Sequence, residues 1–466
     1  MKNHWIASIF IFLCVTNSLC SHSTDEWRSR TIYQIITDRF SRTDGSTQGC
    51  ADLSKYCGGT WKGIENNLDY IQNMGFDAIW ISPVPENLGD DYHGYGALDW
   101  TKLNDHFGTE SDFNSLINAL HKRDMWMMVD VVANHVAPVD LDFSNVVPFN
   151  KAEYYHDKCQ IENWDDPGNV EYCRLANLPD LNQDNSFVRE TLKTWIKDLV
   201  KKYNIDGLRI DTIPEVKREF WGEYTKSAGC YAVGEVFNGD IGYVASYQGY
   251  VPALLNYPMY YTIKDVWMGA DSMYKLREAI NDENQQFQDA TVLGTFTDNH
   301  DNPRFLYDHN DIPNYKNAIT FALFMQGIPI VYYGTEQGFA GGPDPKDRET
   351  LWTNMDTSSD MYKFMKAIVT TRKEHEAWKY PHVERYVNDN FYAFSRGDVL
   401  IATTNTHNTV SIKVTYLPES FTEGTIVCNV FYPETDCTPI QNGGLDVVLE
   451  NGEVKVYTIQ STLVSD

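Results

Sequence analysis

The stretch Gly207-Leu208-Arg209-Ile210-Asp211-Thr212 combines apolar strand-forming residues with two charged side chains near its end. Side chains two positions apart point to the same face of a strand, so Arg209 and Asp211 share a face. Short buried strands that end in charged residues are typical of parallel barrels with a site at the carboxyl ends of their strands. The stretch therefore predicts one such strand, with a site at its end.

Seven more segments of this kind occur along the chain, and amphipathic stretches such as Ser111–Arg123 and Ser186–Tyr203 lie between them. Alternating strands and helices predict a parallel sheet, and eight units predict its closure into a (β/α)8 TIM barrel of the α/β class. The predicted strands are Thr31–Thr37, Asp77–Ser82, Trp126–Val132, Gly207–Thr212, Tyr231–Val236, Ala253–Asn256, Thr291–Thr297 and Gly327–Tyr333.

The spacing of two acidic residues predicts an interruption of the barrel. Asp130 and Asp211 are 81 positions apart, which is too far for one strand–helix unit. We therefore expect an inserted subdomain B at residues 134–181, after the third strand, between barrel segments 21–133 and 182–383. In residues 384–466 strand signals alternate without long helices, which predicts a C-terminal antiparallel β-sandwich.

Residues 1–20 are typical of a secretory signal peptide, because Lys2 precedes an apolar run and small residues end at Cys20. The run is short for a membrane span, and the C-terminus carries neither a lipid-anchor nor a KDEL-type signal. We therefore expect a secreted, extracellular protein without a membrane span. Retention in the endoplasmic reticulum or the cell wall stays open.

The 466-residue chain has a formal net charge of −27. Such a charge disfavours nucleic acid and anionic membranes as partners and suits a neutral or cationic substrate. We expect a monomer that binds no nucleic acid.

Seven cysteines follow the signal peptide, and six of them form close pairs in the sequence. In an oxidising compartment these pairs predict short-loop disulfides, and none has the spacing of a zinc site. The predicted disulfides are Cys50–Cys57, Cys159–Cys173 and Cys428–Cys437, and Cys230 is left over.

Polar side chains also gather at the ends of three other predicted strands. They are Asp130, Asn134 and His135 after the third strand, Glu235 at the fifth, and Asn299, His300, Asp301 and Arg304 after the seventh. Each acid alone is also compatible with a helix N-cap. Four clusters in register favour a shared site, because the strand ends of a barrel meet at one mouth.

These residue types suit cleavage of the acetal bond between two sugars. The reaction needs a protonated acid for the leaving oxygen and an anion for the developing oxocarbenium carbon. Crowded carboxylates raise one pKa, and an arginine lowers another. Because Arg209 shares a strand face with Asp211, we expect Asp211 to be ionised and Glu235 to be the acid.

At these residues the sequence resembles fungal α-amylases of the Taka type, in the α-amylase family of glycoside hydrolases. The likeness runs from about Trp27 to Thr371 and continues more weakly to the C-terminus. Besides the four strand-end motifs, it includes CGGTW (Cys57–Trp61), DYHGY (Asp91–Tyr95), LPDL (Leu178–Leu181), LNYP (Leu255–Pro258) and AGGPDPKDRE (Ala340–Glu349).

The resemblance implies roles for individual residues. Asp211 is implied as nucleophile, Glu235 as general acid/base, Asp301 as a carboxylate that stabilises the transition state, and Asp130 as a structural acid. The residues implied to hold the sugar are His93, Tyr95, His135, Arg209, His300, Asp344 and Arg348. A Ca²⁺ cofactor is also implied, with the side chains of Asn134 and Asp180 and the backbone carbonyls of Glu171 and Glu215 as ligands.

The sequence departs from the family pattern in three places. Pro214-Glu215 stand where the fungal enzymes have Lys-His, Gly96 stands in place of a Trp, and Ala245 replaces a disulfide cysteine. The first two departures fall in the implied substrate cleft, so they bear on substrate length and on the choice between hydrolysis and transfer.

Three functions follow, of which the first is the main prediction. It is a secreted α-amylase, an endo-acting hydrolase of α-1,4-glucosidic bonds in starch- or glycogen-like α-glucans that retains configuration. A 4-α-glucanotransferase acting on cell-wall α-glucan is the alternative, because a retaining enzyme can pass its glycosyl group to a sugar. A catalytically inactive amylase-like binding protein is disfavoured by the three intact acids.

Overall fold

The computed structural model describes residues 22–460, so the predicted signal peptide lies outside the described residues. Eight parallel strands form a barrel in the order β8-β7-β6-β5-β2-β1-β10-β9. A parallel bridge between Leu255 and Gly294 joins the two outer strands and closes it. The strands are β1 (Ile32–Gln34), β2 (Ala78–Ile81), β5 (Trp126–Val131), β6 (Gly207–Ile210), β7 (Tyr231–Gly234), β8 (Ala253–Leu254), β9 (Gly294–Thr295) and β10 (Ile328–Tyr332). The predicted TIM barrel is confirmed.

All eight barrel strands are shorter than the sequence predicts, and the seventh is shortened the most. The residues expected to begin the seventh strand form a 3₁₀ turn instead, Ala290–Val292, because the side chain of Asp289 accepts a hydrogen bond from the backbone N–H of Thr291. Only Gly294 and Thr295 then remain as β9. The strand still ends in the predicted polar cluster.

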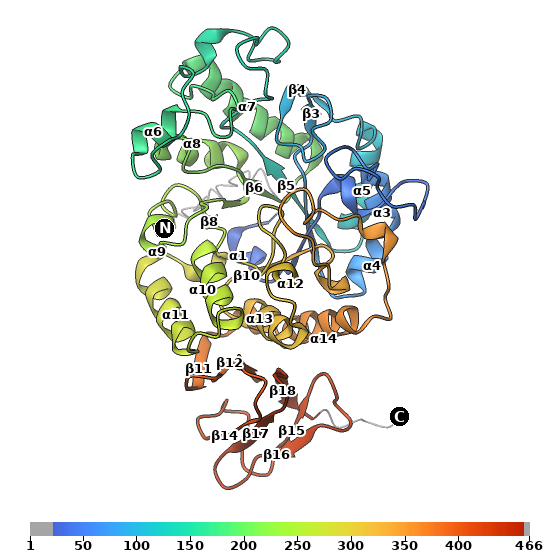
Figure 1. Cartoon of the computed structure of the whole chain (residues 1–466), viewed down its shortest axis with the longest axis vertical. Helices are drawn as coiled ribbons and strands as arrows, with labels where there is room; N and C mark the ends of the chain where they lie inside the picture. The colour runs from blue at the N-terminus through green and yellow to red at the C-terminus, as the bar shows by residue number, and fades with distance from the viewer. Residues whose placement is uncertain (1–21, 461–466) are drawn as a thin grey trace, which may run out of the picture.

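Helices cover the outside of the barrel (Figure 1). The longest, α7 (Ser186–Tyr203), starts where the Asn185 side chain accepts from the N–H of Phe187 and ends at the left-handed residue Asn204. The other helices are α1 (Thr24–Trp27), α2 (Thr37–Phe40), α3 (Trp61–Asn66), α4 (Leu68–Gln72), α5 (Glu110–His121), α6 (Pro167–Tyr172), α8 (Arg218–Ala228), α9 (Ile241–Ala245), α10 (Tyr257–Trp267), α11 (Tyr274–Gln286), α12 (Phe305–Asp308), α13 (Ile312–Phe324) and α14 (Asp360–Glu374). No helix within the described residues is both long and apolar enough to cross a bilayer.

The chain between β5 and β6 leaves the barrel before it returns through α7. It carries α6 and the Cys159–Cys173 disulfide, and an antiparallel bridge joins His135 to Asp180. Residues 134–181, predicted as the inserted subdomain, lie within this excursion.

A hairpin that the sequence pattern did not predict packs on this excursion. Its strands are β3 (Pro85–Asn87) and β4 (Ala97–Leu103). The N–H of Trp100 in β4 donates to the carbonyl of Val147 at 3.0 Å. The loop between the two strands carries His93 and Tyr95, so the hairpin positions residues of the predicted site.

The C-terminal part is the predicted antiparallel sandwich, and it lies below α13 in Figure 1. One sheet has the order β11-β12-β13-β18-β15-β16, and β14-β17 form the other. Their shared core includes Phe391 and Leu400 from the first sheet and Val447 from the second. The strands are β11 (His382–Val387), β12 (Phe391–Arg396), β13 (Val399–Thr404), β14 (Val410–Val414), β15 (Ile426–Asn429), β16 (Cys437–Pro439), β17 (Leu445–Leu449) and β18 (Lys455–Ile459).

All three predicted disulfides are present, Cys50–Cys57, Cys159–Cys173 and Cys428–Cys437. Each closes a short loop, of 7, 14 and 9 positions respectively. The spacing of the cysteines in the sequence was therefore sufficient to predict the pairing.

Candidate active site

Arg209 of β6 lies at the centre of the site and is fully buried. Its Nη1 atom lies 2.7 Å from Oδ1 of Asp211 and 3.0 Å from Oδ1 of Asp130, and its Nη2 atom lies 2.9 Å from Oε1 of Glu235. The acids come from β5, the end of β6 and the end of β7, which are neighbouring strands. One buried cation thus gathers three carboxyl groups that are distant in sequence.

Glu235 is held in a form suited to proton donation. Burial raises the pKa of its carboxyl well above the ordinary value, and the nearby Asp211 and Asp301 raise it further, against the opposing effect of Arg209. The N–H of Thr212 donates to Oε2 at 3.2 Å. A raised pKa favours the protonated carboxyl, which is the form that a general acid needs.

Asp130 is also buried, and burial raises its pKa to about 7 despite the Arg209 contact. It accepts hydrogen bonds from the hydroxyl of Tyr95 at 2.7 Å and from the indole N–H of Trp80 at 3.1 Å. With its oxygens engaged by three neighbours, Asp130 has the surroundings of a structural acid.

Aromatic rings line one wall of the site. The rings of Tyr95 and His300 are stacked with centroids 5.5 Å apart, and the Tyr95 hydroxyl lies 2.7 Å from Nε2 of His300. His93 also stacks on Tyr95, with ring centroids 5.6 Å apart. Burial, Arg209 and Arg348 lower the pKa of His300 well below its usual range, so this ring is neutral.

Asp301 is the most open of the three predicted catalytic acids, with a side-chain exposure of 31%. Its Oδ2 lies 3.4 Å from Nε2 of His300, and its Oδ1 lies 3.9 Å from Nη2 of Arg348. Arg348 also forms an ion pair with Asp344 at 3.1 Å. The structure therefore brings Asp301, His300, Arg348 and Asp344 together beside Glu235.

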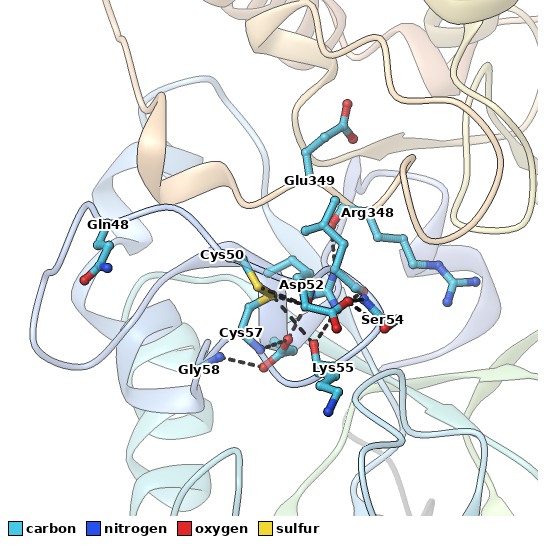
Figure 2. The surroundings of a disulfide bond; sticks show 12 residues. Gln48, Cys50, Asp52, Ser54, Lys55, Cys57, Gly58, Arg348 and Glu349 are labelled. Atoms are coloured by element: carbon cyan, nitrogen blue, oxygen red, sulfur yellow. Dashed lines mark hydrogen bonds and ion pairs between the residues drawn. A yellow bond between two sulfur atoms is a disulfide. The ribbon is translucent and has the colours of Figure 1, made fainter.

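The loop closed by the Cys50–Cys57 disulfide lies near Arg348, as Figure 2 shows, and Arg39 links the two. Buried Arg39 donates to the carbonyl of Arg348 at 2.9 Å and to the carbonyls of Leu53 and Lys55 in the Cys50–Cys57 loop at 2.7 and 2.9 Å. The same loop reaches the hairpin, because its Tyr56 donates to the carbonyl of Asp91 at 3.1 Å.

His135 differs from His93 in what it offers a ligand. Nε2 of His135 is buried and has no hydrogen-bond partner among the described residues, and burial lowers the pKa of this ring. His93 has both ring nitrogens engaged: Nδ1 accepts from the N–H of Tyr95, and Nε2 lies 2.9 Å from Oδ1 of Asp91. His135 is therefore the better placed of the two to hydrogen-bond a sugar hydroxyl.

The predicted calcium ligands converge in part. One end of the Asn134 amide lies 2.8 Å from Oδ1 of Asp180 and 3.2 Å from the carbonyl oxygen of Glu215. With nitrogen at that end, the amide donates to both; with oxygen there, three oxygens face one another as they do around a cation. Glu171 lines a small cavity with His156, whose Nδ1 lies 2.5 Å from Oδ2 of Asp180.

This donor set fits Ca²⁺, which prefers carboxylate, amide and backbone oxygens. Among residues 22–460 no group of three or more His, Cys, Asp or Glu side chains is arranged to hold a metal. The predicted set would not form such a group, because only Asp180 contributes a carboxylate.

The sequence did not single out several residues that complete the site. Gln34, at the end of β1, has its side-chain Nε2 2.8 Å from Nδ1 of His300. The Tyr257 hydroxyl accepts a hydrogen bond from the side-chain amide of Asn299 at 2.8 Å. A polar residue at the end of a buried strand was the available signal for Gln34, but its partner lies 266 positions away.

Comparisons with known proteins agree with this geometry. Residues 34–384 match the family described as "Alpha amylase, catalytic domain". The chain is 38% identical to alpha-amylase 2 of Schwanniomyces occidentalis, over 99% of this chain and 96% of that relative. An alpha-amylase structure from Malbranchea cinnamomea has a TM-score of 0.90 and 39% identity, and covers 95% of this chain and 99% of that one.

A more distant structure is that of a cyclomaltodextrin glucanotransferase with a three-domain ABC distribution. It has a TM-score of 0.81 and 26% identity, over 92% of this chain and 99% of that one. The chain belongs to the α-amylase family and is a glycoside hydrolase, as the motifs predicted. Members of this family generally bind calcium.

Proposed function

We propose that the protein hydrolyses internal α-1,4-glucosidic bonds of starch- or glycogen-like α-glucans and retains the anomeric configuration. The observation that carries this proposal is the position of Asp211 and Glu235 on the two terminal nitrogens of one guanidinium, that of Arg209. A retaining enzyme needs its two carboxyl groups about 5–5.5 Å apart, with one ionised and the other protonated. The shared arginine places the two carboxyl groups side by side, while burial and the nearby Asp211 and Asp301 raise the pKa of Glu235 against its effect.

In the first step, a carboxylate oxygen of Asp211 attacks the anomeric carbon and forms a covalent bond to the sugar. Glu235 gives its proton to the oxygen that leaves. In the second step, Glu235 removes a proton from water, which attacks the same carbon and releases Asp211. Glu235 thus regains its proton, and the glycosidic bond has been hydrolysed by one water molecule.

Asp301 and its neighbours act on the sugar during both steps. In this proposal the open carboxylate of Asp301 hydrogen-bonds sugar hydroxyls and stabilises positive charge at the reacting carbon. Arg348 and His300 hold it in place from one side. Tyr95, His135 and Asp344 provide the remaining polar contacts around this sugar.

Calcium supplies no chemical step here. Bound by the side chains of Asn134 and Asp180 and the carbonyls of Glu171 and Glu215, it would clamp the chain after β5 to the end of β6. Since His135 follows Asn134, the clamp would also fix a residue of the cleft.

Secretion is part of the proposal. Three disulfides in a chain of this size are expected of proteins that fold in an oxidising compartment. The signal-peptide pattern of residues 1–20 supports export through the secretory pathway. We therefore propose an extracellular, monomeric enzyme.

The second candidate is a 4-α-glucanotransferase, and one side chain favours it. Phe237, two positions after Glu235, is 49% exposed and packs on Tyr257 with ring centroids 4.5 Å apart. An exposed aromatic face beside the acid can hold a sugar acceptor in place of water. Pro214-Glu215, where the fungal pattern has Lys-His, also alter the surroundings of Asp211.

Product analysis on maltoheptaose and soluble starch separates these functions. Endo-hydrolysis yields shorter oligosaccharides, with one new reducing end for each bond cleaved. Transfer yields chains longer than maltoheptaose without an increase in reducing ends. A protein that leaves both substrates unchanged, although folded and supplied with Ca²⁺, would refute both enzyme functions.

A further inference from the structure

In the loop between β3 and β4, the side chain of Asp91 lies next to Gly96. A Cβ atom added to Gly96 would lie 1.5 Å from Oδ2 and 2.7 Å from Cγ of Asp91. Real Cβ atoms essentially never lie closer than 3.0 Å to a heavy atom of a residue that is not their neighbour in the chain. The Asp91 carboxylate therefore occupies the space that any side chain at position 96 would need.

Asp91 also determines what His93 presents to a ligand. Nδ1 of His93 accepts from the N–H of Tyr95, so the ring proton is on Nε2, which lies 2.9 Å from Oδ1 of Asp91. Both nitrogens are thus engaged within the protein. In this wall of the site a carboxylate oxygen, rather than an imidazole N–H, is left for the ligand.

Two hydrogen-bond acceptors face the Gly96 position without a protein donor between them. One is Oδ2 of Asp91, to which no donor among the described residues is hydrogen-bonded. The other is Oδ1 of Asn87, which would lie 3.5 Å from a Cβ at Gly96 and is buried without a partner within the described chain. A sugar hydroxyl is a donor that the partly exposed Asp91 carboxylate can bind.

A row of side chains connects Asp91, through its partner His93, to the reacting residues. The rings of His93, Tyr95 and His300 follow one another in a stack, and His300 lies beside Asp301. The Asp91 side chain is 23% exposed, so a ligand can reach it. The loop is fixed, because Tyr56 holds the Asp91 carbonyl.

We propose that Asp91 is a specificity-determining residue: its carboxylate fills the space of a side chain at position 96, holds Nε2 of His93, and accepts a hydrogen bond from a hydroxyl of a bound glucosyl unit. This inference rests on the proposed function. Asp91 thus provides a charged acceptor in the wall where a tryptophan at position 96 would provide a stacking contact. A tryptophan at position 96 would therefore displace the Asp91 carboxylate from this place.

The test is a set of five variants: Gly96→Trp, Asp91→Ala/Gly96→Trp, Asp91→Asn, and Asp90→Ala with and without Gly96→Trp. Asp90 is the matched control, since it is the neighbouring acid, is 65% exposed and forms an ion pair with Lys55 at 3.7 Å. Each protein is assayed for kcat and KM on maltoheptaose and for its melting temperature.

Gly96→Trp should lower kcat/KM at least tenfold, and Asp91→Ala should recover at least fivefold of that loss while Asp90→Ala recovers none. Asp91→Asn, which keeps the shape, should raise KM at least threefold and change kcat less than twofold. The inference is overturned if Gly96→Trp is tolerated with Asp91 present, or if Asp91→Asn leaves KM unchanged.

A wild-type protein inactive on every α-glucan would instead refute the proposed function. The melting temperatures alone then test whether the Asp91 carboxylate occupies the space of a side chain at position 96. Gly96→Trp should lower the melting temperature, and Asp91→Ala, but not Asp90→Ala, should restore at least half of the difference.

Discussion

Nη2 of Arg209 lies 2.9 Å from Oε1 of Glu235, while Nη1 of the same side chain lies 2.7 Å from Oδ1 of Asp211. Lysine has a single nitrogen and cannot contact both carboxyl groups in this way. Arg209→Lys should therefore keep the charge but lower kcat on maltoheptaose at least 100-fold, about 2.7 kcal/mol of transition-state stabilisation.

A control for this variant is Arg189→Lys, at a surface arginine that pairs with Glu223. It should leave kcat unchanged. Equal kcat values for Arg209→Lys and the wild type would show that Arg209 does not organise the two acids.

Glu235→Gln should remove the general acid without changing the shape of the site. Turnover of maltoheptaose should fall at least 1,000-fold, in keeping with the usual contribution of proton transfer. α-Maltosyl fluoride needs no protonation of its leaving group, so its kcat/KM, which reports the first step, should fall less than tenfold. Equal losses on the two substrates would contradict the role of Glu235 as acid.

The pKa of Glu235 also predicts a change in stability with pH. A folded-state pKa raised above the unfolded value means that the native protein binds more protons, so stability falls as pH rises from the unfolded pKa, near 4.5, toward the folded one. Glu235→Gln removes this penalty and should raise the melting temperature at pH 7 to 8 by about 2 °C or more. At pH 4 the two proteins should melt together. A lower melting temperature of the variant at pH 8 would contradict the sign.

Calcium should stabilise the fold by mass action, because only the native chain gathers its ligands. EDTA should lower the melting temperature and added Ca²⁺ should restore it. Asp180→Asn should abolish this response, whereas Asp142→Asn, at an exposed acid that binds Ser144, should retain it. Identical curves with and without chelator in the wild type would argue against a calcium site.

The fold was accessible from the sequence because each barrel strand repeats a local pattern of an apolar run followed by polar residues. The β3–β4 hairpin was not predicted because its pairing is irregular, with register shifts on both sides of Glu86, so it leaves no regular alternation in the sequence. Strand-end logic also located Arg209 and the three acids. The strand-end pattern could not show that Asp91 fills the space of a side chain at position 96, because that depends on the conformation of the β3–β4 loop.

The Cys50–Cys57 disulfide should matter for substrate binding as well as for stability, since its loop supports Arg348 through Arg39. Replacing both cysteines by serine should destabilise the fold by about 2 kcal/mol and raise KM for maltoheptaose at least threefold. The matched control is the same change at Cys428 and Cys437, in the sandwich. That control should lower the melting temperature without affecting KM, and an equal KM effect in both variants would contradict the specific link to Arg348.

The most direct test of the account is to trap the glycosyl-enzyme intermediate. A 5-fluoro α-glycosyl fluoride slows the second step more than the first, so the covalent intermediate accumulates and its mass can be measured in the intact protein and in its peptides. We predict one added glycosyl group, located on Asp211 and absent from Asp211→Asn. A label on another residue, or turnover of maltoheptaose by Asp211→Asn within tenfold of the wild type, would contradict the assignment of Asp211 as the nucleophile.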